Sequence, residues 1–259
     1  MESLVTRFRQ RKTSGQKISS LTAYDYPTAR LVDEAGVDLI LVGDSLGMVV
    51  LGYPDTTSVT LDDMVRHTGA VARGVKHTPV ITDLPIHTYD TPEQALDSAR
   101  LMIEAGAHGV KIEGGESVMP QMKALTTAGS PVLAHLGMLP QQIRQEGGYK
   151  VKGRSAREAD QLLRDAAAVQ AAGAFAVVLE IVTQELATRM TAGLQIPTIG
   201  IGSGDGCDGQ ILVLHDLVGL YPWFRPKFVT PRADLAASLS QAVREYTQGI
   251  RGNLDMTPP

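Results

Sequence analysis

The chain lacks the residues and segments that several common classes of protein require. Its 259 residues include one cysteine, Cys207, which excludes an intramolecular disulfide and a metal site built from several thiolates. No run approaches the roughly 18 apolar residues of a membrane helix, and no apolar segment follows the basic residues near the start, as a signal peptide requires. We therefore expect a cytoplasmic protein with no membrane partner.

Charge of one sign is not concentrated anywhere in the chain. Lys and Arg number 24 against 28 Asp and Glu, for a formal net charge of -4, and the two signs are interspersed. Binding to a phosphate backbone needs a concentrated basic stripe, so nucleic acid is not an expected partner. Cys207 lies in a glycine-rich loop with no evident base beside it, which leaves a catalytic thiol as a minor alternative.

Aromatic residues are also scarce, at 5%, whereas apolar residues make up 43% and glycine occurs 26 times. Short β-rich apolar runs alternate with longer Ala-rich segments along the chain, the pattern of repeated βα units. This pattern predicts an α/β fold, a single-domain (β/α)8 TIM-type barrel over 1–259, with an N-terminal extension or short helix at 1–17 and a loose tail at 250–259. The expected strands lie near 18–24, 39–44, 80–84, 109–113, 132–136, 176–180, 197–202 and 210–214.

Helix boundaries carry their own sequence signals. Thr60, Thr91 and Ser155 begin patterns typical of helix N-termini, and Gly36 and Gly106 stand where a helix must end before the next strand. The expected helices are 60–77, 92–106, 117–128, 155–172, 183–193 and 232–248.

Four predicted strands end on an acid: Asp44, Asp83, Glu113 and Glu180. The carboxyl ends of parallel barrel strands share one rim, where four close negative charges require a counterion. Oxygen ligands without a His or Cys cluster favour Mg2+. The alternative is that Asp44 and Asp83 are ordinary helix N-caps.

Two further groups lie on the same rim. Lys111 and Glu113 are two residues apart on one strand and point the same way, so Lys111 either contacts a substrate carboxylate or oxyanion, or joins an ion-pair network. Glu180 follows only apolar residues and is the candidate general base, with a salt-bridge role as the alternative. His135 is either a donor to substrate or a core histidine, and the loop 200–210 either binds an anion or forms a tight turn.

The motifs LTAYDY, VGDSLGMVVLGY, TDLP, VKIEGG, AHLG, VLE and IPTIGIGSGDGCDGQILV occur in this order between about residues 18 and 228. Together they resemble the ketopantoate hydroxymethyltransferase family. The resemblance implies transfer of a hydroxymethyl unit from 5,10-methylenetetrahydrofolate to 3-methyl-2-oxobutanoate, giving 2-dehydropantoate for pantothenate and coenzyme A biosynthesis. It also implies one Mg2+ per subunit and a homo-oligomer, often a decamer.

Carried over motif by motif, the resemblance makes Asp44, Asp83 and Glu113 the metal ligands, Glu113 directly or through water. Asp44 and Asp83, with Ser45 and Lys111, would also contact the keto acid, and Glu180 would accept the proton whose loss leaves a Mg2+-stabilised enolate. The chain departs from the usual pattern at several positions, including Ser203 in place of Ala. A phosphoenolpyruvate mutase or isocitrate lyase type barrel is the rival enzyme, and a silent barrel that binds a keto acid is the rival from another class.

Overall fold

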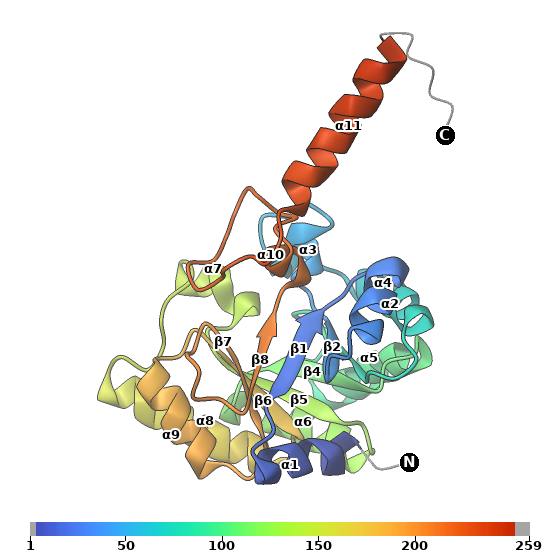
Figure 1. The fold of residues 1–259 in the computed structure, drawn as a ribbon. Helices are drawn as coiled ribbons and strands as arrows, with labels where there is room; N and C mark the ends of the chain where they lie inside the picture. Colours follow the sequence, from blue (N-terminus) through green and yellow to red (C-terminus); the bar gives the residue numbers. More distant parts are fainter. Residues whose placement is uncertain (1–3, 252–259) are drawn as a thin grey trace. The chain divides into compact units, whose positions relative to one another are not determined.

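The computed structural model describes residues 4–251 and contains a closed barrel of eight parallel strands (Figure 1). Each strand pairs with the next in the sequence, and β8 pairs with β1 to close the sheet. Nearly every strand position is buried because helices cover the outside and side chains fill the inside. The strands are β1 Ile18–Thr22, β2 Leu39–Val42, β3 Val80–Asp83, β4 Gly109–Glu113, β5 Val132–Gly137, β6 Ala176–Glu180, β7 Thr198–Ile201 and β8 Gly209–Leu212.

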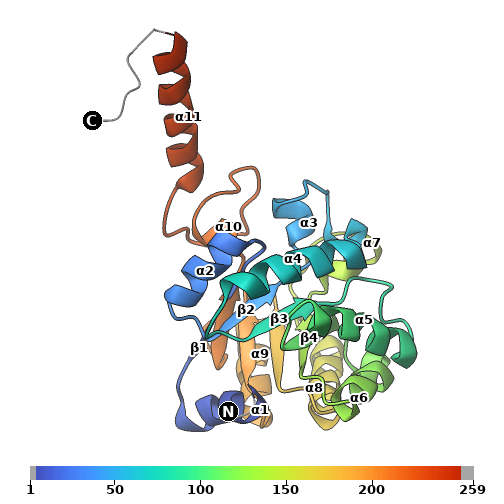
Figure 2. The same cartoon turned by 90° about the vertical axis from the view of Figure 1, so that its right-hand side faces the viewer.

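Helices alternate with these strands, which confirms the predicted (β/α)8 fold (Figure 2). The side chains of Thr60, Thr91 and Ser155 each accept a hydrogen bond from the backbone N–H three residues later, as the capping patterns predicted. The α-helices are α1 Leu4–Ser14, α2 Tyr26–Glu34, α3 Leu46–Val49, α4 Leu61–Gly74, α5 Pro92–Glu104, α6 Met119–Thr127, α7 Ile143–Glu146, α8 Ala156–Ala171, α9 Gln184–Gly193, α10 Leu214–Leu217 and α11 Leu235–Arg251; the 3-10 helices are η1 Thr56–Ser58, η2 Glu116–Val118 and η3 Pro140–Gln142.

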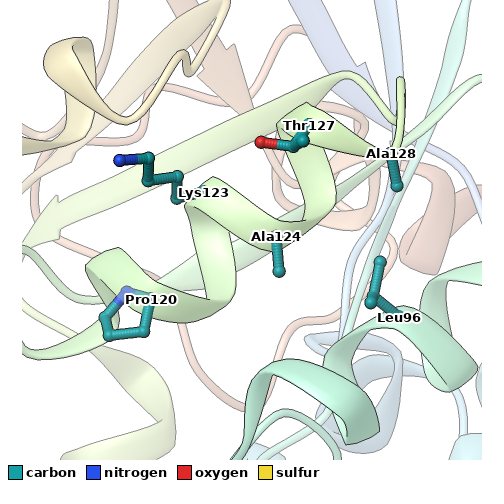
Figure 3. A pocket seen from close by; sticks show the side chains of 6 residues that line it. All are labelled: Leu96, Pro120, Lys123, Ala124, Thr127 and Ala128. Carbon is teal, nitrogen blue, oxygen red and sulfur yellow. The ribbon is translucent and has the colours of Figure 1, made fainter.

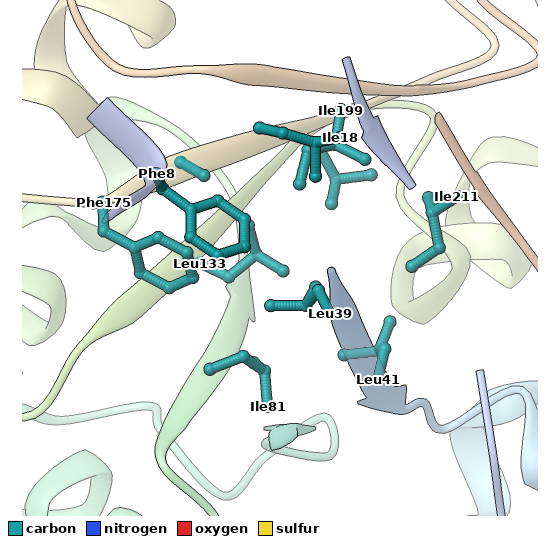
Figure 4. Close-up of a cluster of buried hydrophobic side chains, with 11 residues drawn as sticks. Phe8, Ile18, Leu39, Leu41, Ile81, Leu133, Phe175, Ile199 and Ile211 are labelled. Carbon is teal, nitrogen blue, oxygen red and sulfur yellow. The ribbon is translucent and has the colours of Figure 1, made fainter. Parts of the chain in front are cut away.

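The barrel core begins at the amino ends of the strands. Helix α1 lies there (Figure 1), and its Phe8 belongs to the buried cluster (Figure 4). Phe8 of α1 is 1% exposed and packs edge-on against Phe175, with ring centroids 5.3 Å apart. Ion pairs from α1, Arg11 to Asp38 and Lys12 to Asp208, fix the helix to the strand ends. The expected N-terminal helix is therefore part of the barrel's packing.

The chain divides into two compact units, Met1–Leu212 and Val213–Pro259. The first contains the whole barrel, and the second contains α10 and α11. Ile250 and Arg251, at the start of the expected tail, belong to α11, and the rest of that tail lies outside the described residues. No helix within residues 4–251 has the length and apolar character to span a membrane.

Candidate active site

The four predicted acids do gather at the carboxyl ends of neighbouring strands. Asp83 and Glu113 are the last residues of β3 and β4, Glu180 is the last residue of β6, and Asp44 follows β2 by two residues. Asp44, Asp83 and Glu113 are each less than 5% exposed. Three carboxylates withdrawn from water in this way require compensation by positive charge or hydrogen-bond donors.

Asp44 and Asp83 are in direct contact through the backbone. The Asp44 N–H donates to Oδ2 of Asp83 at 3.0 Å. A Cβ at Gly43 would lie 2.9 Å from Ser45 Oγ and 3.6 Å from Asp83 Oδ2, so glycine lets these side chains come close. Burial, followed by the charges of Asp83 and Glu113, raises the pKa of Asp44 well above its usual value.

Lys111 supplies a positive charge inside this cluster. Its Nζ lies 2.7 Å from Asp83 Oδ1 and 3.7 Å from Glu113 Oε1. Burial alone would lower the pKa of Lys111, but Asp83, Glu113 and Asp44 together raise it, so the ammonium is charged at neutral pH. The ion-pair network expected as one alternative for Lys111 is therefore present.

Glu113 is held by two donors from β5 and the segment that follows it. His135 Nδ1 lies 3.1 Å from Oε1, and the backbone N–H of Gln141 donates to Oε2 at 3.1 Å. Burial acts to raise the pKa of Glu113, but His135, Lys111 and the Gln141 N–H outweigh it and lower that pKa. Glu113 is thus an ionised carboxylate with a fixed orientation.

Glu180 lies on the other side of His135. His135 Nε2 is 3.3 Å from Glu180 Oε2, a charge contact rather than a well-aligned hydrogen bond. Burial lowers the pKa of His135, but the charge of Glu113 and the contacts with both acids raise it to about 9. The Glu180 side chain is 14% exposed, so it is the acid of this group with the most access to a ligand above the rim.

Gln141 and Tyr89 belong to the site, although the sequence analysis predicted no role for either. Gln141 Nε2 donates to Asp44 Oδ2 at 2.8 Å and to the Leu84 carbonyl at 2.9 Å. The Tyr89 hydroxyl donates to Gln141 Oε1 at 2.5 Å. Both are buried, and they connect Asp44 to Glu113 through loops that lie far apart in the sequence.

Ser45 stands at the start of α3, next to Asp44. Its Oγ lies 2.8 Å from the hydroxyl of Tyr24, the residue that ends the LTAY motif. Tyr24 is buried, so it holds Ser45 from the β1 side of the rim. Ser45 therefore shares the rim with Asp44 and Asp83, as the motif predicted.

The loop 200–210 packs closely against its neighbours. A Cβ at Gly204 would lie 2.5 Å from Gln184, and one at Gly206 would lie 2.1 Å from Thr188, both on α9. This close approach supports the tight-turn interpretation. Cys207 is 1% exposed, and burial raises the pKa of its thiol, which disfavours the thiolate that a nucleophile needs.

The carboxylate oxygens at the rim suit a hard cation that also binds oxygen atoms of water or substrate. Asp83 Oδ1 is buried and has the Lys111 contact but no well-aligned hydrogen bond, and the surroundings of Asp44 disfavour its ionised form. No three His, Cys, Asp or Glu side chains in residues 4–251 converge tightly enough to hold a metal alone. Mg2+ commonly binds through one or two carboxylates plus water and substrate oxygens, so Asp44 and Asp83 fit it.

A surface hollow elsewhere on the barrel does not compete with this site. It lies between α5 and α6 and contains no carboxylate and no residue of the acid cluster (Figure 3). Its lining consists of Leu96, Pro120, Lys123, Ala124, Thr127 and Ala128.

Comparison with known proteins agrees with the motif resemblance. A family model described as ketopantoate hydroxymethyltransferase matches residues 3–253. The 3-methyl-2-oxobutanoate hydroxymethyltransferase of Acetivibrio thermocellus is 51% identical over 249 residues, covering 95% of this chain and 88% of that protein. The protein of the same name from Chloroflexus aurantiacus is 52% identical over 252 residues, covering 97% and 89%.

Among solved structures, phosphoenolpyruvate phosphomutase from Streptomyces platensis subsp. rosaceus superposes with a TM-score of 0.66 at 16% identity, covering 98% of this chain and 92% of that one. At this identity the likeness concerns the fold alone. The family match, the two relatives and the acids on the barrel rim lead to one assignment. This chain belongs to the ketopantoate hydroxymethyltransferase family and is a hydroxymethyltransferase.

Proposed function

We propose that the protein transfers a hydroxymethyl unit from 5,10-methylenetetrahydrofolate to 3-methyl-2-oxobutanoate, giving 2-dehydropantoate for pantothenate and coenzyme A biosynthesis. The relatives' names support the keto acid as the acceptor. The observation that carries the proposal is the rim itself, where a partly exposed carboxylate, Glu180, stands beside a buried group of three acids and one lysine.

In this proposal Asp44 and Asp83 would hold one Mg2+, with Glu113 as the third acid of the metal shell. The bound ion would act as a Lewis acid on the carboxylate and ketone oxygens of the keto acid, which makes the C3 proton easier to remove. The chain's own residues then have to bind the acid, orient it and take that proton.

Glu180 is the proposed general base that removes the C3 proton. It is the rim acid with the greatest exposure, and His135 restricts its orientation. Lys111 offsets the charge of the bound keto acid, and Ser45 donates a hydrogen bond to it. The carbon nucleophile left by proton loss forms a C–C bond to the methylene carbon carried by the folate, and one C–N bond to that carbon breaks as its nitrogen takes the proton held by Glu180. Water then replaces the second nitrogen on the same carbon, which leaves the hydroxymethyl group on the product and releases tetrahydrofolate with the remaining proton.

Exchange of the C3 hydrogen of 3-methyl-2-oxobutanoate in heavy water tests the chemistry without the folate. We expect Mg2+-dependent exchange, followed by NMR, that a chelator stops and added Mg2+ restores. A second assay with both substrates should yield 2-dehydropantoate. Exchange that persists with the chelator would remove the metal from the proposal, and no exchange from folded, Mg2+-loaded protein would overturn it.

A silent barrel that only binds the keto acid would bind substrate and Mg2+ but show neither exchange nor product.

We further propose that the protein works in the cytoplasm as a homo-oligomer, a decamer in the family pattern. Light scattering of the full chain measures that state directly, and a monomer at the concentrations used in the assay would contradict it.

A further inference from the structure

We propose that Ser203, in the loop after β7, is a positioning residue for Glu180. The inference rests on the proposed function, because it concerns the residue proposed there as the base. Ser203 is 1% exposed and lies beside the end of β6, where its single side-chain oxygen reaches the backbone on both sides of Glu180.

The two hydrogen bonds of Ser203 enclose the residue that they position. Its hydroxyl donates to the Leu179 carbonyl at 2.7 Å, with the Ile201 carbonyl farther away at 3.4 Å. Its oxygen accepts the Val182 N–H at 3.0 Å. The hydroxyl thus joins the residue before Glu180 to the second residue after it.

This connection matters because the backbone between them is bent into an unusual conformation. Ile181 has φ 49, in the left-handed region that a β-branched residue rarely occupies. Such a conformation persists only where the surroundings fix it, and it is concentrated at functional sites. The bend ends β6 immediately after Glu180, so the groups that hold it also hold the backbone from which the Glu180 side chain extends.

Neighbouring backbone groups fix the rest of the bend. The Glu180 carbonyl accepts the Met138 N–H at 2.8 Å, the Ile181 N–H donates to Ile201, and the Ile181 carbonyl accepts the Lys152 N–H. Gly137 permits the first of these, because a Cβ there would lie 2.3 Å from the Glu180 oxygen. Ser203 provides the connection that depends on a side chain, so it can be removed by substitution.

The test compares Ser203→Ala with Thr198→Val in the heavy-water exchange assay. Thr198 is a matched control: it lies at the opposite end of β7, is fully buried, and its hydroxyl also accepts a backbone N–H, from Asp208 at 3.2 Å. At saturating Mg2+ and keto acid, we expect exchange about tenfold slower in Ser203→Ala, since small misplacement of a reacting group is costly. The half-saturating keto acid concentration should stay within about twofold of wild type, because Ser203 contributes nothing to binding. Thr198→Val should exchange within about twofold of wild type.

Two further variants keep the inference testable. In Ser203→Cys the side chain has a similar size and its thiol is a weak hydrogen-bond donor and acceptor, so the exchange rate should lie between those of wild type and Ser203→Ala. This variant decides the question if the alanine variant does not fold. In a Glu180→Gln background, Ser203→Ala should cause no additional loss of the residual rate, because it acts through Glu180.

An exchange rate for Ser203→Ala within twofold of wild type, or a loss no larger than that of Thr198→Val, would overturn the positioning role. An equal loss from Ser203→Ala in the Glu180→Gln background would do the same. If the wild-type protein itself does not exchange, the proposed function fails instead, so the two failures are distinguishable.

Discussion

The Nε2 atom of His135 lies 3.3 Å from Oε2 of Glu180, on the adjacent strand of the barrel. With its pKa raised to about 9, His135 is protonated at neutral pH and places a positive charge between Glu113 and Glu180. A substitution at Glu180 therefore also changes the surroundings of a buried cation. For this reason glutamine, which keeps a polar side chain of the same length, is the informative replacement.

Glu180→Gln should slow C3 exchange at least about 100-fold, within the range expected for loss of a general base. Keto acid and Mg2+ should still bind, because the proposed binding groups lie on β3 and β4 and just after β2. Exchange is measured by NMR and binding by calorimetry. The exposed acid Glu185 on α9 provides the control, since Glu185→Gln should change neither. Normal exchange in Glu180→Gln would assign proton removal to another residue.

Asp44→Asn should weaken Mg2+ binding at least about 10–100-fold, because even the loss of an outer-shell partner of a metal ligand has an effect of that size. Mg2+ at about 100 times its wild-type Kd should stabilise the wild type by ~2.7 kcal/mol but the variant by no more than about 1.4 kcal/mol. Thermal unfolding with and without Mg2+ measures both.

Without metal, Asp44→Asn should have the opposite effect on stability. The pKa of Asp44 is raised in the folded protein, so its ionised form is disfavoured there, and stability falls as pH rises from the unfolded pKa of the carboxyl toward its raised folded pKa. Asp44→Asn should therefore be at least as stable as wild type at pH 7 in chelator. Equal Mg2+ responses in the two proteins would argue against Asp44 as a ligand.

Asp33, which lies away from the rim, should make part of the protein's stability depend on pH. It is 5% exposed and accepts three backbone N–H bonds, from Lys76 at 2.9 Å, His77 at 3.1 Å and Thr78 at 2.8 Å. Burial acts to raise the pKa of Asp33, but these hydrogen bonds lower it below its usual value. A lowered pKa gives stability above the unfolded value, near 3.9, that disappears as pH falls through the folded value.

Asp33→Asn should therefore cost about 1.5–3 kcal/mol at pH 7, the range for hydrogen bonds to a charged group, and much less near pH 3. Urea unfolding at both pH values measures the difference. Glu34→Gln, next to it on α2 and exposed, should shift stability by less than about 0.5 kcal/mol at either pH. A pH-independent loss in Asp33→Asn would contradict the assignment.

Phe8→Ala should destabilise the protein by about 3–5 kcal/mol, because it removes a fully buried ring from the amino end of the barrel core. Val5 on the same helix is 36% exposed, so Val5→Ala should have a much smaller effect. Both are measured by urea unfolding at pH 7. Similar losses in the two variants would mean that α1 stabilises the protein through its helix as a whole rather than through Phe8.

The sequence predicted the strands well because most of them are short aliphatic runs, and three of them end on an acid. Asp83, Glu113 and Glu180 are the final residues of their strands in the structure, and Gly36 has the positive φ that its position required. Helix α2 was missed, although Asp25 caps it and Pro27 stands in its first turn, because it is short and follows the LTAYDY motif directly.

The contacts that complete the site could not be predicted in the same way. Gln141 reaches Asp44 across 97 positions of sequence, and an amide in a loop has no pattern that distinguishes it. The left-handed conformation at Ile181 contradicts its local preference and is imposed by Met138, Lys152 and Ser203 from other elements. Strand ends depend on local chemistry, whereas these features depend on the closed barrel.

Phe8, buried against Phe175, belongs to the packed side chains at the amino end of the barrel. Glu180 ends β6 at the opposite end, so the helix that completes the core and the carboxylate proposed as the base are separated by the length of the strands. A change in α1 should therefore alter the free energy of unfolding and leave the groups at the rim in place.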